Sequence, residues 1–167
     1  MQEKRAALDV IDEKKSMLFS LSDQLWENPE VKYKEFSAAD QFCQILEGEG
    51  FQLEKNLAGI KTAFSGSYGE GRPVIGILAE YDALPGLSQL AGVTEKKPEK
   101  EGAPGHGCGH NLLGTGALGA AIAVKEYLKK TGKSGTIKLM GCPAEEGGAG
   151  KGFMARDGAF DDLDAAF

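Results

Sequence analysis

Residues 74–78 read Val-Ile-Gly-Ile-Leu, and this continuously apolar run restricts the possible folds more than any other part of the sequence. A strand with one face in water alternates apolar and polar residues, whereas an uninterrupted apolar run is typical of a strand covered on both faces. The run leads directly into Glu80, Tyr81 and Asp82, and open α/β sheets place their ligands at the carboxyl ends of such strands. We therefore expect a sheet with helices on both sides and a functional role for these acids; an acidic turn without function is the alternative.

The rest of the chain alternates between helical and strand-like patterns. Helical spacing of apolar residues, or runs of small residues, predict helices over residues 3–27, 37–48, 112–128 and 151–157. Strand-like runs occur at 51–55, 60–65, 73–78 and 136–142, and residues 165–167 resemble the start of another. A glycine-rich turn is expected at 66–71 and an irregular surface loop at 87–104. This alternation predicts an α/β fold, a three-layer sandwich with a largely parallel or mixed sheet.

Composition limits the classes of function. The chain has 167 residues, 41% of them hydrophobic, which suits one domain with a real core. Its 19 basic and 25 acidic residues give a net charge of −6, which argues against nucleic acid or an anionic membrane surface as a partner. No apolar run approaches the roughly 20 residues of a membrane span, and no signal-peptide core is present, so we expect a cytoplasmic protein. Three cysteines fit a reducing compartment, and we expect Cys43 and Cys142 to be packed apolar groups.

The segment Gly-His-Gly-Cys-Gly-His-Asn at 105–111 holds both histidines of the chain. Because glycine adopts backbone conformations that other residues resist, Cys108 and His110 can turn toward one metal ion. We expect Asn111 to cap the helix that follows, and the helix dipole to lower the pKa of the Cys108 thiol and favour its thiolate. A plain tight turn and a phosphate-binding loop are the alternatives, but neither requires Cys108 or His110.

A second cluster, Gly-Cys-Pro-Ala-Glu-Glu-Gly-Gly at 141–148, follows the strand-like run 136–142. Neighbouring residues in a turn point in different directions, so one carboxylate can bind a metal while the other acts as a base toward water. The alternative is a solvated acidic turn, but the flanking proline and glycines favour a loop of defined shape. Glu145 and Glu146 are therefore candidate functional residues.

Three motifs together resemble the metal-dependent amidohydrolases of the zinc-peptidase-like family. The motifs are Glu-Tyr-Asp-Ala-Leu-Pro-Gly at 80–86, His-Gly-Cys-Gly-His-Asn at 106–111 and Pro-Ala-Glu-Glu-Gly-Gly at 143–148, in the order and at the spacing of that family. The family includes hippurate and auxin-conjugate hydrolases, and the chain resembles in particular the branch of aminobenzoyl-glutamate hydrolase. Its relatives usually have aspartate in place of Asn111. The resemblance covers nearly the whole chain and implies a zinc-exopeptidase-like catalytic domain.

The resemblance also implies a two-metal site. Cys108, His110 and Glu146 would bind metal, and Glu145 would be the general base that deprotonates water and then protonates the leaving amine. Two divalent ions, zinc or manganese, are the implied cofactors.

Three further residues have roles beside the metal in this comparison. Asp82 would orient the metal site, and His106 would contact metal-binding residues without binding the metal itself. Glu80 occupies a place where distant relatives have a histidine ligand, so its role is open.

The implied substrate is a small N-acyl or aminobenzoyl amino acid, or a dipeptide-like molecule, whose amide bond is hydrolysed. Residues 1–167 would be the N-terminal part of the catalytic domain, without the rest of that domain and without the lid or dimerisation domain of the full-length homodimer. Because the later histidine ligands of the family would then be missing, we expect this truncated chain alone to be inactive.

Two other classes of function stay open. One is a non-catalytic binding or scaffold fragment. The other is a hydrolase in which Cys108 is the nucleophile and a histidine the base; it is disfavoured because the sequence offers no independent third group to orient such a pair.

Overall fold

One mixed sheet contains all the strands of the described chain, residues 2–167, whose side chains are described from residue 5 onward in this computed structural model. The strands are β1 (Gln52–Lys55), β2 (Phe64–Glu70), β3 (Val74–Ala79), β4 (Gly135–Gly141) and β5 (Ala165–Ala166), in the order β1-β2-β4-β3-β5 across the sheet. β2 pairs antiparallel with β1 and β4, whereas β3 pairs parallel with β4 and β5. The expected mixed α/β sheet is confirmed.

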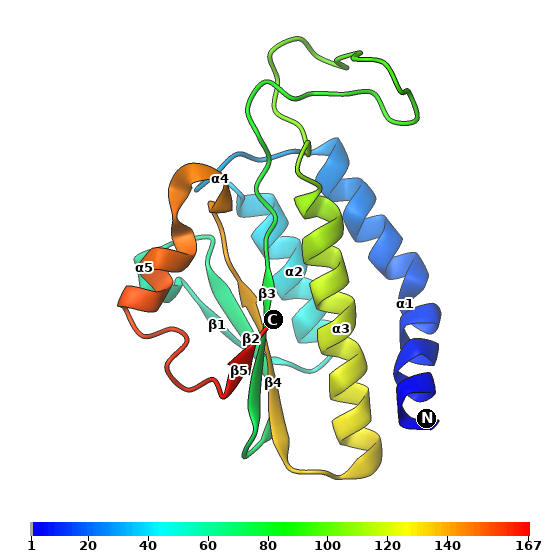
Figure 1. Ribbon diagram of the computed structural model, residues 1–167, viewed down its shortest axis with the longest axis vertical. Helices are drawn as coiled ribbons and strands as arrows, with labels where there is room; N and C mark the ends of the chain where they lie inside the picture. The colour runs from blue at the N-terminus through cyan, green and yellow to red at the C-terminus, as the bar shows by residue number, and fades with distance from the viewer. Residues whose placement is uncertain (1) are drawn as a thin grey trace.

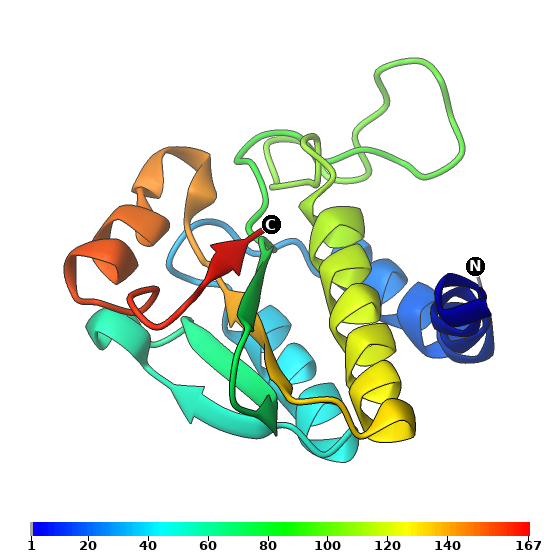
Figure 2. The same cartoon turned by 60° about the horizontal axis from the view of Figure 1, so that its bottom comes forward.

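Helices cover both faces of the sheet (Figures 1 and 2). The helices are α1 (Gln2–Glu27), α2 (Phe36–Gly48), α3 (His110–Thr131), α4 (Glu145–Gly148) and α5 (Gly150–Arg156), with a short 3-10 helix, η1 (Leu57–Gly59). On β4, Leu139 belongs to the core shared with α1, α2 and α3, whereas its neighbour Met140 packs with Met154 of α5 on the other face. This alternation gives β4 an apolar surface on both sides and produces the three layers.

The apolar run that ends in Glu80-Tyr81-Asp82 is β3, as expected, and its carboxyl end is anchored in the core. The Tyr81 ring is fully buried and lies 5.4 Å from the Phe42 ring and 5.8 Å from the Phe64 ring, centre to centre. Its hydroxyl donates a 2.7 Å hydrogen bond to the carbonyl oxygen of Thr62. Glu80 and Asp82, on either side of this anchored residue, are thereby held in fixed positions.

The prediction for β2 is wrong in its boundaries. The sequence suggested a strand at 60–65 and a turn at 66–71, but the strand runs from Phe64 to Glu70 through the glycine-rich segment. A Cβ added at Gly66 would lie 2.8 Å from Cδ1 of Leu46 on α2. This glycine therefore allows α2 to approach the sheet closely and does not form a turn.

The start of α3 also differs from the prediction. The helix begins at His110, and the residue before it, Gly109, adopts a left-handed conformation (φ 80°) and provides no side-chain cap. Asn111 does not cap the helix: its side chain donates a 3.1 Å hydrogen bond to Oγ of Ser22 on α1. Residues 87–104, which precede this motif, form the expected irregular surface loop and project away from the layers (Figure 1).

No helix in the described part of the chain is long and apolar enough to cross a membrane.

Candidate metal centre

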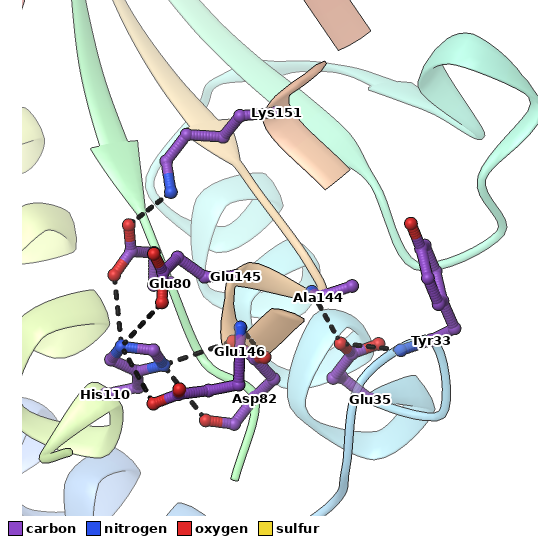
Figure 3. Close-up of polar contacts among 9 residues, drawn as sticks. All are labelled: Tyr33, Glu35, Glu80, Asp82, His110, Ala144, Glu145, Glu146 and Lys151. Atoms are coloured by element: carbon purple, nitrogen blue, oxygen red, sulfur yellow. Dashed lines mark hydrogen bonds and ion pairs between the residues drawn. The ribbon is translucent and has the colours of Figure 1, made fainter. Parts of the chain in front are cut away.

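His110 lies at the point where the predicted site residues meet. Its Nδ1 is 3.0 Å from the carbonyl oxygen of Asp82 and 3.1 Å from Oδ1 of the same residue. A carbonyl oxygen can only accept, so Nδ1 carries the proton and donates. The other ring nitrogen, Nε2, faces carboxylates: it lies 3.1 Å from Glu80, 3.8 Å from Glu145 and 3.9 Å from Glu146 (Figure 3). Such an arrangement leaves Nε2 as the ring atom available to a ligand.

Two groups of donor atoms share this imidazole. Cys108, His110 and Glu146 each offer one atom, and the three atoms lie within 4.8 Å of one another; Glu80, His110 and Glu145 form a second group with the same spread. The first group is the predicted set of metal ligands, which the fold brings together. Thiolate, imidazole and carboxylate together suit zinc and related divalent ions.

One carboxylate oxygen of Glu146, a residue of the first group, also fits a metal. Oε1 of Glu146 is buried and has no hydrogen-bond partner among the described residues. The backbone of the same residue is held in place, because its N–H donates a 2.8 Å hydrogen bond to Oδ2 of Asp82. A buried polar atom without a partner is costly unless something else contacts it. The donor set and this orphaned oxygen are therefore compatible with a bound divalent ion.

Asp82 sets the electrostatics around His110. Burial by itself raises the pKa of Asp82, but the hydrogen bonds from His110 and from the Glu146 amide outweigh burial and bring this pKa below its ordinary value. The hydrogen bond with Asp82 in turn raises the pKa of His110. Asp82 thus contacts one predicted ligand through its side chain and another through that ligand's backbone.

The prediction that the Cys108 thiol ionises readily is wrong for the chain without metal. Cys108 is exposed, and it precedes the first helical residue by two positions. A hydrogen bond to the Glu146 carboxylate raises the pKa of the thiol, and the charges of Glu146, Glu145 and Asp82 act in the same direction. These effects oppose the lowering that the helix dipole was expected to give. A metal cation would reverse the sign of the local field and favour the thiolate.

His106 lies outside both groups of donor atoms. It is buried, and burial lowers the pKa of its ring, which hydrogen-bonds to the backbone of Leu25 at the end of α1. Its Nδ1 has no hydrogen-bond partner among the described residues. Its predicted contact with metal-binding residues stays a prediction.

Several residues of the site escaped the sequence analysis. Lys151 of α5 pairs with Oε1 of Glu80, which leaves Oε2 of Glu80 facing His110. Glu35 and Tyr33 contact the turn that carries Glu145. Isolated charges and aromatics of this kind carry no signal in a single sequence, because their partners are more than 70 residues away.

The structure corrects the argument against a cysteine nucleophile. The sequence appeared to offer no third group to orient a Cys108–His110 pair, but Asp82 does orient His110. The raised pKa of the Cys108 thiol is the property that disfavours this mechanism, because the thiolate is the nucleophile. A phosphate-binding loop is disfavoured by the carboxylates of Glu80, Glu145 and Glu146, which would repel an anion.

Comparisons with known proteins identify relatives of the chain. The chain is 49% identical over 158 residues to one of the subunits of p-aminobenzoyl-glutamate hydrolase from Escherichia coli, a match that covers 95% of this chain and 33% of that protein. It is 33% identical over 146 residues to hippurate hydrolase of Campylobacter jejuni, which covers 86% of this chain and 36% of that protein. The chain thus spans about a third of the length of these relatives.

A solved structure and a family match extend the comparison. The fold superposes on a dinuclear metal-binding peptidase of the M20 family from Bacillus subtilis with a TM-score of 0.77 and 26% identity, over 91% of this chain and 41% of that one. Residues 76–167, which include all the predicted site residues as well as Glu80, match one peptidase family. The chain therefore belongs to peptidase family M20/M25/M40.

Proposed function

We propose that the whole protein is a metal-dependent amidohydrolase that cleaves the amide bond of an N-acyl or aminobenzoyl amino acid. The 49% identity to part of an aminobenzoyl-glutamate hydrolase supports an aryl amide of glutamate as substrate, and the hippurate hydrolase relative supports the wider class of acylated amino acids. One structural observation carries the proposal. Donor atoms of Cys108, His110 and Glu146, which arise from two different segments, converge within 4.8 Å.

The proposed ligands of the metal centre are Cys108, His110 and Glu146. Two divalent ions, zinc or manganese, would supply Lewis acidity that activates water and polarises the amide carbonyl. Asp82 would hold the proton on Nδ1 of His110, so that Nε2 keeps its lone pair for the metal; this role is supported by the 3.1 Å contact between the two side chains.

Glu145 is the proposed general base. Its side chain is 41% exposed, so it can reach a substrate that approaches from solvent, and its Oε2 lies 3.8 Å from Nε2 of His110. A carboxylate in this position would take a proton from the attacking water and return it to the nitrogen of the leaving amino acid. The backbone of the adjacent Glu146 is tied to Asp82, so the two carboxylates can have separate roles.

The test is hydrolysis by the full product of the reading frame that contains this chain, with residues 1–167 assayed in parallel. Chelator-treated protein is assayed on aminobenzoyl-glutamate and hippurate before and after addition of Zn²⁺ or Mn²⁺. We expect the full product to lose turnover on chelation and recover it with metal. Residues 1–167 are expected to be inactive, because three protein ligands are fewer than a two-metal site normally uses. Failure of the metal-loaded full product on every substrate would contradict the proposal.

Two other functions give different results in the same assay. A Cys108 nucleophile is supported by two observations: donor atoms of Cys108 and His110 lie within 4.8 Å of each other, and Asp82 orients the imidazole. It would give turnover that survives chelation and is abolished by thiol alkylation. A scaffold would give no turnover under any condition. A homodimeric full-length protein and a cytoplasmic location are further predictions, which size-exclusion chromatography and cell fractionation would test.

A further inference from the structure

The turn that carries Glu145 and Glu146 has a backbone that needs support from outside. Ala144 precedes it in a left-handed conformation (φ 58°, ψ 40°), Ala149 follows it in another (φ 56°, ψ 35°), and Glu146 within it departs from helical geometry. Residues with a Cβ rarely adopt left-handed conformations, and such conformations persist only where surrounding contacts impose them. The contacts that hold this turn therefore decide where the two carboxylates point.

Glu35, the residue just before α2, holds the start of the turn. Its carboxylate is fully buried, and its Oε1 accepts hydrogen bonds of 2.8 Å from the N–H groups of both Ala144 and Tyr33. Its Oε2 accepts a 3.0 Å hydrogen bond from the hydroxyl of Thr62. No salt bridge to Glu35 occurs within the described residues. A buried carboxylate without a cation is unfavourable for stability alone. The effect of this carboxylate is instead to fix the position of Ala144, which is 109 residues away in the sequence.

Tyr33 holds the other end of the turn. Its hydroxyl donates a hydrogen bond to the carbonyl oxygen of Gly148. The contact is close: a Cβ added at Gly148 would lie 2.5 Å from Cβ of Ala144 and 3.1 Å from Cε2 of the Tyr33 ring. The Tyr33 backbone is itself left-handed (φ 61°), and its N–H is bound to Glu35. Tyr33 and Glu35 are thus hydrogen-bonded to each other and together bind both ends of the turn, Glu35 at Ala144 and Tyr33 at Gly148.

The third attachment lies between these two, where the N–H of Glu146 donates to Asp82. The turn is therefore bound at Ala144 by Glu35, at Glu146 by Asp82 and at Gly148 by Tyr33. Of these three residues, Asp82 is the one that also contacts His110. Figure 3 shows the carboxylates of Glu145 and Glu146 directed to the His110 side of the turn, with Glu35 and Tyr33 on the other side.

We propose that Tyr33 and Glu35 are positioning residues, which hold the turn Ala144–Gly148 so that Glu145 and Glu146 face His110. This inference rests on the proposed function of those two carboxylates. A displacement of a catalytic group by about 1 Å can cost on the order of a hundredfold in rate. Loss of the hydrogen bond from either Glu35 or Tyr33 to the turn is therefore expected to lower kcat and to leave KM nearly unchanged.

Four variants separate positioning from general stability. Glu35→Met keeps the apolar volume but removes the acceptor for Ala144, whereas Glu35→Gln keeps an oxygen for both backbone N–H groups and an amide for Thr62. Thr62→Val is the matched control, because it removes a hydrogen bond from the same carboxylate without touching the turn. Tyr33→Phe removes only a hydroxyl from a residue that is 37% exposed, so it is expected to fold even where Glu35→Met does not.

The first measurement is amide hydrogen exchange of Ala144 by NMR in residues 1–167, which does not depend on hydrolysis. We expect Glu35→Met to speed this exchange by at least about tenfold. Exchange at Leu139 in β4 should be unchanged, and Glu35→Gln and Thr62→Val should match the parent. Unchanged exchange of Ala144 in Glu35→Met would overturn the inference, even in a protein that proves to have no activity.

The second measurement is the kinetics of the metal-loaded full product. We expect Glu35→Met and Tyr33→Phe to lower kcat by about tenfold to a hundredfold with little change in KM. Glu35→Gln and Thr62→Val should stay within about threefold of the parent, with unfolding in urea measured for all four variants. Parent-like kcat in Glu35→Met and Tyr33→Phe, or an equal loss in Thr62→Val, would overturn the inference while leaving the proposed function intact.

Discussion

At the scale of single residues, His110 links acids that arise from the ends of two strands. Asp82 follows β3, and Glu145 and Glu146 follow β4. These strands are parallel neighbours, so their carboxyl ends meet at one edge of the sheet, where open α/β folds place their ligands. His110 reaches this edge from the first turn of α3. The fold thereby brings the imidazole next to carboxylates that are all distant from it in the sequence.

Substitutions of the neighbouring residues Glu145 and Glu146 are predicted to affect kcat and metal content differently. Glu145→Gln in the full product should keep its metal but lose about 10²- to 10⁴-fold in kcat, because an amide cannot accept the proton of water. Glu146→Gln should lose metal first, since Glu146 belongs to the proposed ligand set and its Oε1 is buried without a hydrogen-bond partner among the described residues. Metal content by elemental analysis, measured beside kcat, distinguishes the two. The reverse pattern would exchange the two assignments.

The cysteines give a second prediction at this scale. Burial raises the pKa of Cys43 to about 11 and that of Cys142 to about 12, whereas Cys108 is exposed. A thiol reagent should therefore label one cysteine in the native chain at neutral pH, and Cys108→Ser should abolish this labelling. Zn²⁺ should slow the labelling of Cys108 if its sulfur binds metal. An equal rate with and without Zn²⁺, in a chain that binds Zn²⁺ by calorimetry, would remove Cys108 from the ligands.

At the scale of elements, α3 is positioned by its small residues. A Cβ added at Gly114 would lie 2.4 Å from the carbonyl oxygen of Glu80 and 2.9 Å from Cζ of Phe42. This glycine thus lets the first turns of α3 approach the end of β3, and so brings His110 within reach of Glu80 and Asp82.

Two alanine substitutions in the same helix test this packing. Gly114→Ala should destabilise the chain by about 1–3 kcal/mol, because the backbone of Glu80 has to move. Gly116→Ala is the control: nothing lies within 4 Å of a Cβ added there, so it should stabilise the helix by about 0.5–1 kcal/mol. Urea unfolding of both variants gives the comparison. Equal effects of the two substitutions would show that close packing at Gly114 does not matter.

Elements whose periodicity reflects burial were predictable, and those shaped by distant contacts were not. The apolar run of β3 was interpreted correctly because its side chains pack on both faces, Ile75 and Ile77 against one core cluster and Leu78 against the other. The small-residue pattern of α3 was interpreted correctly because most of its small residues are buried. β2 was misplaced because Gly66 and Gly69 resemble turn residues, although they serve close approaches to Leu46 and to the carbonyl oxygen of Gly135. The identity of a glycine's neighbour is information that a single sequence does not contain.

The same limit applies to the candidate site at the scale of the whole molecule. Cys108, His110 and the two adjacent glutamates could be proposed from their residue types and flanking glycines, and the fold brings these side chains together. The contacts of Asp82 with His110, of Lys151 with Glu80 and of Glu35 with Ala144 join segments 28, 71 and 109 residues apart. Such contacts depend on the packing of the complete fold, so local patterns do not reveal them.

Far from the site, Glu49 ties three helices together. It follows the last residue of α2, and its carboxylate binds Lys125 of α3 at 2.8 Å and Lys14 of α1. Lys125 is only 4% exposed and also donates to the backbone carbonyl of Glu49. Glu49→Gln should therefore cost about 1–3 kcal/mol at pH 7, since the buried Lys125 ammonium then keeps only one of its two carboxylate partners, Glu126 at 2.8 Å.

The pH dependence of this cost has a definite sign. Burial raises the pKa of Glu49, but the hydrogen bonds from Lys125 and Lys14 outweigh it, and the pKa lies below its ordinary value of 4.5. A carboxyl with a depressed folded pKa stabilises the fold above its unfolded pKa and loses that contribution as the pH falls through the folded value. The stability difference between the parent and Glu49→Gln, measured by urea unfolding, should therefore be constant from neutral pH to about pH 5 and shrink at lower pH. Glu47→Gln, an exposed neighbour with the same change of charge, is the control and should differ little from the parent throughout. A difference between parent and Glu49→Gln that does not shrink in acid would mean that packing of the side chain, and not its charge, holds the three helices together.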